Sequence, residues 1–348
     1  MIILGIETSC DETSVALVKD GRDVLACTIH SQIAQHQPYG GVVPEIASRS
    51  HVEVLPSVIG KTLTDAGITW SQIDAIAATH GPGLASSLLI GFSAAKALAL
   101  SQNKPLIPIN HLEAHLYAIF LGSNAPSPND VMPLLGLLVS GGHTCLIRMD
   151  HLNQYTLLGQ TIDDAAGEAL DKGASLLSLG YPGGPIVEKT AQHANPTFVR
   201  FPRGKVRSVT AKHIDPNLCF SFSGVKTSLK YHLKKYPEQL QPETLPDLTA
   251  SYQEAILDAL VKRFSLALQQ TGVRHAACGG GVVCNKTLRN KLTDAASKNH
   301  CTLHMAEPKY CTDNAAMVAG LAHHRQDAST EAVFSQEINP NLTIGKKL

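Results

Sequence analysis

Two histidines four positions apart are the residues whose types and spacing point most directly to chemistry. In the run Asn110-His111-Leu112-Glu113-Ala114-His115, a helix would place both imidazoles on one face. Paired imidazoles suit a metal ion, but two ligands do not make a tight site, so a third must come from elsewhere. Asp313, at the start of a predicted late helix, is the candidate. The alternative is a solvated or core pair, because 16 histidines make such spacings common.

This spacing differs from that of zinc peptidases, in which a glutamate directly follows the first histidine and acts as general base. Here Glu113 follows His111 by two positions, which is about 200° around a helix. Its carboxylate should point away from the metal face. A peptidase would therefore lack its base.

Two short polar turns could hold phosphate groups. The first is Thr8-Ser9-Cys10-Asp11-Glu12-Thr13, and the second is Ser140-Gly141-Gly142-His143-Thr144. Hydroxyls and backbone N–H groups bind phosphate oxygens in such turns, and glycine allows close approach. Asp11 and Glu12 would repel a phosphate, so they indicate a cation or a proton-transfer role and are the candidate catalytic residues. An ordinary hairpin turn is the alternative for each loop.

A third glycine-rich segment, Gly279-Gly280-Gly281, stands at a predicted strand-to-helix junction and is followed by Asn285. Three glycines leave room for a flat base or a ribose, which Asn285 could hydrogen-bond. Many such runs are merely flexible, which is the alternative here.

The charge is balanced, with 29 Lys+Arg against 29 Asp+Glu in 348 residues, so no global basic field exists. Any nucleic acid must be held by a local patch or with a partner's help. A polar stretch from 195 to 223 is locally basic and predicts either a phosphate-binding patch or a solvated loop. Its candidate residues for contact with a nucleic acid are Arg200, Arg203, Lys205 and Arg207.

The composition of 44% apolar and 17% charged residues is typical of a globular protein. The eight cysteines form no C-x-x-C pair, and no basic segment with a cleavage site stands at the start. The longest apolar stretch, Leu84–Leu100, is interrupted by serines and a lysine. We therefore expect reduced thiols, no membrane association and a cytoplasmic location.

The elements that must position these residues alternate between strands and helices, which predicts an α/β fold. Strands are expected over 2–7, 14–19 and 24–29, and the pattern restarts near 135 after a Pro-rich linker at 123–128. Leu4-Gly5, Ser9 and Thr13 recur 131 residues later, as Leu135-Gly136, Ser140 and Thr144. This constant offset indicates an internal duplication.

The predicted fold class is α/β, with two duplicated domains, mixed sheets flanked by helices and a central cleft. In the actin, hexokinase and Hsp70 superfamily, two such hairpins bind the phosphates of a nucleotide. The analogy between this chain and that superfamily concerns the fold alone. We expect a first domain over 1–110 and a second over 111–348, with an insertion near 195–245. The last residues of the chain could pack back on the first domain.

The chain resembles the TsaD-type tRNA adenosine threonylcarbamoyltransferases along nearly its whole length. The matching stretches are Gly5–Thr13, Tyr39–Glu45, Gly81–Leu84, the two histidines, Leu138–Thr144, Asp163–Ala169, Tyr181–Pro185, Ser221–Thr227, Gly279–Asn285 and Cys311–Met317. The resemblance implies the actin-like fold. It also implies transfer of a threonylcarbamoyl group from threonylcarbamoyl-AMP to the adenosine 3′ of the anticodon, in tRNAs reading codons that begin with A.

The resemblance also implies site residues, a cofactor and partners. One iron or zinc ion would be bound by His111, His115 and Asp313. A smaller metal-free TsaB-like paralogue and a TsaE-like P-loop ATPase would assist. Together with the loops described above, the expected threonylcarbamoyl-AMP site comprises Ser9, Leu138, Val139, Ser140, Gly141, Gly142, His143, Asp171, Gly184, Glu188, Gly280 and Asn285. A metallopeptidase and a non-catalytic nucleotide-binding scaffold are the competing hypotheses.

Overall fold

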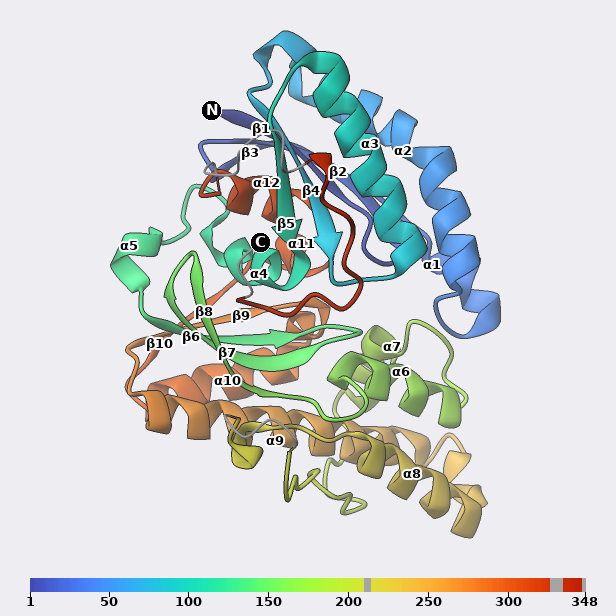
Figure 1. The fold of residues 1–348 in the computed structure, drawn as a ribbon. Coiled ribbons are helices and arrows are strands. Elements are labelled where there is room, and N and C mark those ends of the chain that lie inside the picture. The colour runs from blue at the N-terminus through green and yellow to red at the C-terminus, as the bar shows by residue number, and fades with distance from the viewer. Residues whose placement is uncertain (210–213, 326–333, 346–348) are drawn as a thin grey trace. The chain divides into compact units, whose positions relative to one another are not determined.

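The computed structural model describes residues 1–209, 214–325 and 334–345, and it divides into two compact units. Unit 1 comprises 1–130 and 306–348, and unit 2 comprises 131–305 (Figure 1). Within the described ranges, no helix is both long enough and apolar enough to cross a membrane. Each unit is built on one five-stranded mixed sheet.

The sheet of unit 1 has the strand order β3-β2-β1-β4-β5. β1 pairs antiparallel with β2, and β2 with β3, whereas β4 lies parallel to β1 and β5 parallel to β4. Every residue of β4 and β5 is buried, as expected for parallel strands covered on both faces. The strands are β1 (Ile2–Glu7), β2 (Glu12–Lys19), β3 (Asp23–Ser31), β4 (Ala75–Gly81) and β5 (Leu106–Asn110).

Helices cover both faces of this sheet. Leu4 and Ile6 of β1 belong to a core shared with α2 and α3, whereas a Cβ on Gly5 would meet Ala315 O of α12 at 2.5 Å. Because side chains alternate along a strand, α12 lies on the face opposite α2 and α3. The helices are α1 (Ile33–His36), η1 (Gln37–Tyr39), α2 (Pro44–Ala66), η2 (Trp70–Gln72), α3 (Ala85–Gln102), α4 (His111–Tyr117), η3 (Ala118–Phe120), α5 (Pro128–Val131), α11 (Pro308–Cys311) and α12 (Ala315–Ala322).

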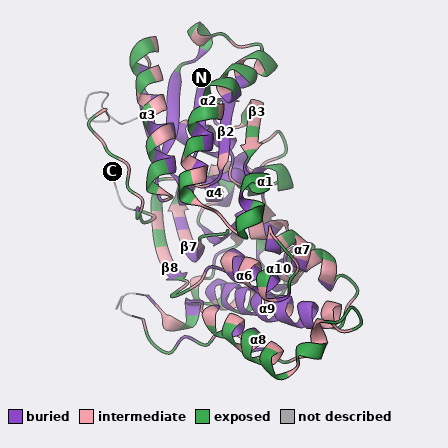
Figure 2. Cartoon of the chain, turned by 90° about the vertical axis from the view of Figure 1, so that its right-hand side faces the viewer, coloured by how far each residue is buried: buried purple, intermediate pink, exposed green. Residues whose placement is uncertain are grey.

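Unit 2 repeats this topology in the strand order β10-β9-β6-β7-β8. The central helix α9 packs its buried face on the sheet and appears mostly purple in Figure 2. The strands are β6 (Leu134–Val139), β7 (Thr144–His151), β8 (Gln154–Gln160), β9 (His275–Gly279) and β10 (Thr302–Met305). The helices are α6 (Ala166–Leu176), α7 (Gly183–Ala191), η4 (Pro216–Leu218), α8 (Ser223–Lys235), η5 (Pro237–Leu240), α9 (Leu245–Thr271), η6 (Gly281–Cys284) and α10 (Lys286–Lys298).

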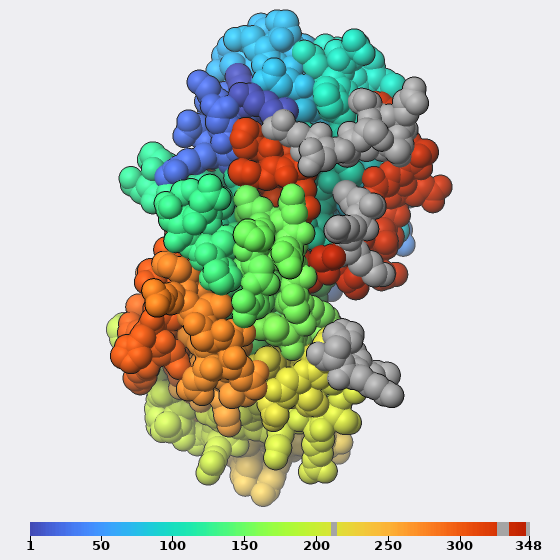
Figure 3. Space-filling view, turned by 60° about the vertical axis from the view of Figure 1, so that its left-hand side comes forward, coloured from blue at the N-terminus to red at the C-terminus, as the bar shows by residue number. Residues whose placement is uncertain are grey.

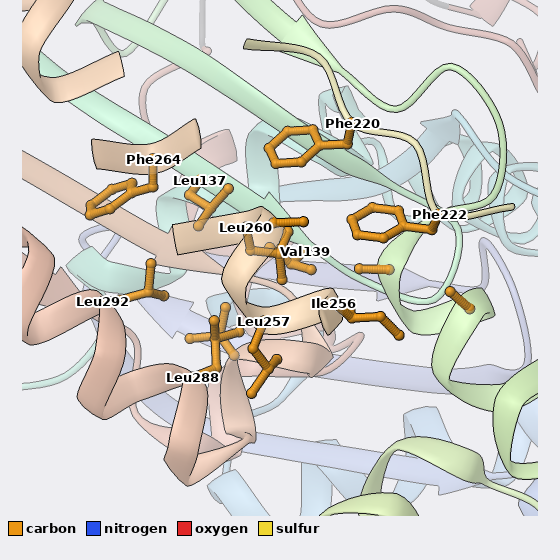
Figure 4. Close-up of a cluster of buried hydrophobic side chains, with 14 of the residues drawn as sticks. Leu137, Val139, Phe220, Phe222, Ile256, Leu257, Leu260, Phe264, Leu288 and Leu292 are labelled. Atoms are coloured by element: carbon orange, nitrogen blue, oxygen red, sulfur yellow. The ribbon is translucent and has the colours of Figure 1, made fainter. Parts of the chain in front are cut away.

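The core of unit 2 joins β6 to its helices. Leu137 and Val139 of β6 meet the buried rings of Phe220 and Phe222, which precede α8, and leucines of α9 and α10 (Figure 4). Burying a side chain of this size is worth about 1.5–3 kcal/mol. This core therefore fixes the end of β6, where the second polar turn begins.

The strand registers support the duplication. Ile6 of β1 pairs with Val15 of β2, and Leu137 of β6 pairs with Leu146 of β7. Both members of the second pair lie 131 positions after their counterparts in the first. The offset of 131 residues therefore relates the paired strand positions of the two hairpins as well as their residue types.

The expected domain boundary after residue 110 differs from this division. α4 begins directly after β5 and packs on α12, so residues 111–130, 306–325 and 334–345 belong with the first sheet. In Figure 3, red residues near the end of the chain lie against blue residues of the first strands. Of the expected insertion near 195–245, residues 210–213 lie outside the described residues; the rest contains η4, α8, η5 and the first residue of α9.

Candidate functional site

Three predicted ligands come together in unit 1. Single donor atoms of His111, His115 and Asp313 all lie within 4.8 Å of one another. The two imidazoles project from α4, with ring centroids 4.5 Å apart, as their spacing predicts. Asn110 starts that helix, because its Oδ1 accepts hydrogen bonds from the backbone N–H groups of Leu112 and Glu113. Asp313 lies two residues before the first turn of α12.

The donor set fits a metal ion. Both ring nitrogens of His115 are buried and make no hydrogen bond to any residue that the structure describes. Its Nε2 nevertheless lies 3.0 Å from Asp313 Oδ1, and His111 Nε2 lies 3.7 Å from the same oxygen. A buried polar atom without a partner is costly, and an ion shared by the three side chains would satisfy Nε2 of His115. Two imidazoles and a carboxylate suit both zinc and iron.

Glu7 orients His111 from behind. Its Oε2 lies 3.1 Å from His111 Nδ1, which also lies 3.1 Å from Ser9 Oγ. Glu7 in turn accepts hydrogen bonds from Ser9 N at 2.6 Å and from Thr79 Oγ1 at 2.5 Å. Such a carboxylate–histidine pair fixes the ring and its tautomer in many metal sites. Glu7 was not among the predicted site residues, although an acid ending an otherwise apolar strand was an available signal.

These charges change the proton affinities of both partners. Burial raises the pKa of the Glu7 carboxyl, but the charge and hydrogen bond of His111 outweigh burial, so that pKa lies below its usual value. Burial lowers the pKa of His111, but the charges of Glu7 and Asp313 prevail and raise it to about 9. The pair is therefore ionised near neutral pH when no cation is bound.

The first polar turn lies beside this cluster and contains Asp11 and Glu12. Burial, with the charges of Asp313 and Asp11, raises the pKa of Glu12 to about 10. His51 of α2 holds the turn, because its Nε2 donates to Cys10 O at 3.0 Å and its Nδ1 lies 2.7 Å from Thr13 Oγ1. The predicted catalytic acids thus stand on a loop fixed by buried hydrogen bonds.

Glu113 faces away from the candidate metal ligands, as its position on the helix predicts. Its carboxylate pairs with Arg325 and accepts a hydrogen bond from Gly345 N at 3.1 Å. Both partners belong to the segment after α12. The glutamate between the two histidines is therefore bound to residues near the end of the chain.

The second polar turn lies in unit 2, at the end of β6. Ser140 closes it, because its N–H donates to His143 O at 2.8 Å and its Oγ accepts from His143 N at 3.1 Å. A Cβ on Gly141 or Gly142 would meet no atom within 4 Å, so this backbone is open to a ligand. Leu138 and Val139 have wholly buried side chains, so only their backbone could contact one.

The remaining predicted adenylate residues of unit 2 make local contacts there. Gly280 has φ +93°, and a Cβ there would meet Val139 O at 2.3 Å, so the triple glycine packs directly on β6. Asp171 Oδ1 accepts a hydrogen bond from Gly183 N at 2.7 Å, next to Gly184. Glu188 Oε1 accepts one from Lys286 N at 2.7 Å, next to Asn285.

Asn285 is itself buried and fixed. Its Oδ1 accepts a hydrogen bond from Leu288 N at 2.9 Å, which caps α10, and its Nδ2 donates to Gln253 Oε1 at 2.9 Å. Its role as a capping residue was not among the sequence expectations. The amide therefore has a structural role besides the expected contact with a ribose or base.

The four basic residues expected to contact tRNA differ in their surroundings. Arg200, Lys205 and Arg207 are exposed. Arg203 is half-buried, and its guanidinium donates to Asp258 Oδ2 at 2.9 Å and to Phe201 O at 2.6 Å. Arg203 is therefore part of the packing of unit 2.

The chain is similar in sequence to a family of known proteins. The family model described as "TsaD: tRNA N6-adenosine threonylcarbamoyltransferase" matches residues 23–320. A tRNA N6-adenosine threonylcarbamoyltransferase from Trichlorobacter lovleyi is 48% identical over 319 residues, which covers 92% of this chain and 90% of the relative. A protein of the same name from Caldicellulosiruptor saccharolyticus is 42% identical over 347 residues, which covers 100% of this chain and 99% of the relative.

Among solved structures, (R)-2-hydroxyglutaryl-CoA dehydratase component A from Acidaminococcus fermentans is similar, with a TM-score of 0.54 and 14% identity. The match covers 93% of this chain and 98% of that one. At this identity the likeness shows the fold alone. The predicted actin-like α/β class, with two mixed sheets flanked by helices, is confirmed.

Proposed function

The chain belongs to the family of tRNA N6-adenosine threonylcarbamoyltransferases, and we propose that its transfer reaction depends on one ion held by His111, His115 and Asp313. The family activity is threonylcarbamoyladenosine modification of tRNA. The observation that carries the metal proposal is the convergence of three donors, one of which, His115, has buried ring nitrogens without hydrogen-bond partners among the described residues. When bound, the ion would act as a Lewis acid that holds the threonyl carboxylate and hydroxyl.

Unit 1 prepares this centre through its own residues. Glu7 accepts a hydrogen bond from His111 Nδ1–H, which leaves the Nε2 lone pair directed at the ion site. His115 offers Nε2, and Asp313 offers Oδ1. Fixed donors of this kind orient a substrate carbonyl and reduce the entropy lost in the transition state.

Unit 2 contains all the proposed adenylate-binding residues except Ser9, which lies in unit 1. The open backbone of Gly141 and Gly142 can donate hydrogen bonds to the phosphate, on which negative charge grows as AMP leaves. Asp171 and Glu188 can accept hydrogen bonds from ribose hydroxyls, because a carboxylate offers several lone-pair positions. Gly280 and Asn285 would contact the nucleoside.

In the proposed transfer, the exocyclic amine of the tRNA adenosine attacks the carbamoyl carbon. The new C–N bond forms as the bond to the phosphate oxygen of AMP breaks. Asp11 is the proposed acceptor of the amine proton or organiser of the charge around it, and Glu12 is the second candidate acid beside it. No acyl-enzyme is required, since the amine is the nucleophile.

The proposed assembly includes tRNA, threonylcarbamoyl-AMP, a smaller metal-free paralogue and a P-loop ATPase. A cytoplasmic location fits a tRNA substrate. Iron and zinc are both suitable ions for this donor set. The engaged position of Glu113 disfavours a peptidase, and retention of all three donors disfavours a non-catalytic scaffold.

The test is reconstitution of the full chain with synthetic threonylcarbamoyl-AMP, unmodified tRNA and the partner proteins, with the nucleosides measured by mass spectrometry. We expect modified adenosine with the wild type and a loss of at least about 100-fold with His111→Ala. His193→Ala, at an exposed histidine of unit 2, is the matched control. Full activity of His111→Ala after removal of metal would overturn the metal proposal.

A further inference from the structure

A large surface groove lies in unit 2, lined by the segment 202–206, by α9 and by α10. Its volume is about 1180 Å³. None of the residues expected to bind the adenylate lines it. Ligand pockets for small molecules measure roughly 300–1,000 Å³, so this groove suits a larger, extended ligand.

The groove concentrates positive charge in a chain whose net charge is +0. Two lining residues, Asp258 and Asp294, are acidic. Six are cationic: Arg203, Lys205, Lys262, Arg263, Lys291 and Lys298. A local basic surface on a neutral protein is the electrostatic signature of a site for a polyanion.

Part of this charge builds the groove. The buried guanidinium of Arg263 donates to the carbonyls of Gly204 and Cys219, which ties the segment 202–206 to α9. Gly204 has φ +53°, and a Cβ there would meet Ser221 O at 1.9 Å. The wall is therefore fixed before any ligand arrives, which lowers the cost of binding.

A second part of the charge is neutralised internally. Asp258 accepts from Arg203 at 2.9 Å and from Lys291 at 2.8 Å, and Lys291 also pairs with Glu254. Lys205, Lys262 and Lys298, by contrast, are exposed and make no ion pair with any residue in the described ranges. These three ammonium groups remain available to an external anion.

We propose that this groove binds the phosphate backbone of the tRNA through Lys205, Lys262 and Lys298. The inference rests on the proposed function, since that function supplies the polyanion. Lysine–phosphate contacts release counterions and give affinity without reading sequence. The groove would hold the body of the tRNA while the adenosine is modified elsewhere, and Asp294 would limit how closely a phosphate approaches its side of α10.

The experiment compares two triple variants of the full chain for binding to unmodified tRNA over a range of salt concentrations. The groove variant is Lys205→Glu, Lys262→Glu and Lys298→Glu. The control is Lys19→Glu, Lys230→Glu and Lys234→Glu, which changes the charge equally at exposed lysines outside the groove. All six positions are exposed, so we expect both variants to keep the wild-type melting temperature.

We expect the groove variant to bind tRNA at least about tenfold more weakly at ~0.1 M salt, with a slope of log K against log[salt] shallower by about 2–3. The control should stay within about threefold of the wild type. Equal loss in both variants, or wild-type affinity in the groove variant, would overturn the inference. So would loss of a protein partner with unchanged tRNA affinity, which would make the groove a protein-docking site. Failure of the proposed function is separate, because it would appear as a wild type that transfers no threonylcarbamoyl group.

Discussion

Glu7 Oε2 and His111 Nδ1 lie 3.1 Å apart in the interior of unit 1, one at the end of β1 and the other at the start of α4. The two residues are 104 positions apart in sequence. Thr79 and Ser9 hold the carboxylate in place. The pair connects the first strand of the fold to the candidate metal centre.

Replacing this carboxylate tests its effect on the metal. In Glu7→Gln the ring of His111 loses its anionic acceptor, so we expect metal affinity to fall by about 10–100-fold. The amount of metal bound per chain and competition with a chelator measure this affinity. Glu53→Gln, at an exposed position of α2, should leave the affinity unchanged. Equal affinities of the two variants would contradict the role of Glu7.

His51 should position the acidic turn without binding the metal. In His51→Ala, Cys10 O and Thr13 Oγ1 lose buried hydrogen bonds, and we expect the free energy of unfolding to fall by about 2–4 kcal/mol. Transfer activity should fall further than in Val58→Ala, a core truncation in the same helix that leaves the turn intact. Metal content should be unchanged in both. An activity loss no larger than that of Val58→Ala would make His51 merely structural.

Two glycines in the proposed adenylate site should differ in their tolerance of alanine. In Gly280→Ala a Cβ would meet Val139 O at 2.3 Å in a conformation that disfavours side chains, so we expect a loss of about 2–5 kcal/mol in unfolding free energy. In Gly141→Ala the Cβ enters open space, so the change should stay within about 1 kcal/mol. Denaturant unfolding measures both. Similar losses in the two variants would show that the close packing of Gly280 on β6 does not determine the cost of an added Cβ.

His324 should contribute to acid sensitivity. Burial, with the neighbouring charges of His323 and Arg325, lowers the pKa of His324 to about 4, and its Nε2 lies 3.0 Å from the Tyr117 hydroxyl. Since the unfolded chain binds this proton more readily, stability is fully present above about pH 6.5 and is lost as the pH falls towards 4. The decline in unfolding free energy over this range should be smaller in His324→Gln. An identical decline would show that other groups cause it.

The proximity of two candidate metal ligands could be predicted, because helical spacing places His111 and His115 on one face whatever the tertiary fold. The duplication could be predicted for a similar reason, since Ile6–Val15 and Leu137–Leu146 repeat a local hairpin. Local geometry was enough in both cases.

The position of the domain boundary and the role of Glu7 depend on packing between segments that are far apart in the sequence. A linker was recognised at 123–128, close to the division at 130, but the boundary was expected after 110. Nothing near residue 111 indicates that α4 packs on α12, some 200 positions later. Glu7 likewise gains its role only when β1, β4 and α4 meet.

The discontinuity of unit 1 sets the order in which the centre can be assembled during synthesis. Between His115 and Asp313 the ribosome makes the whole of unit 2, which takes about 10–40 s at ~5–20 residues per second. A nascent chain can therefore complete its second lobe while the first still lacks its closing helix and the carboxylate donor. The proposed ion site would thereby be complete only after Asp313 has been made.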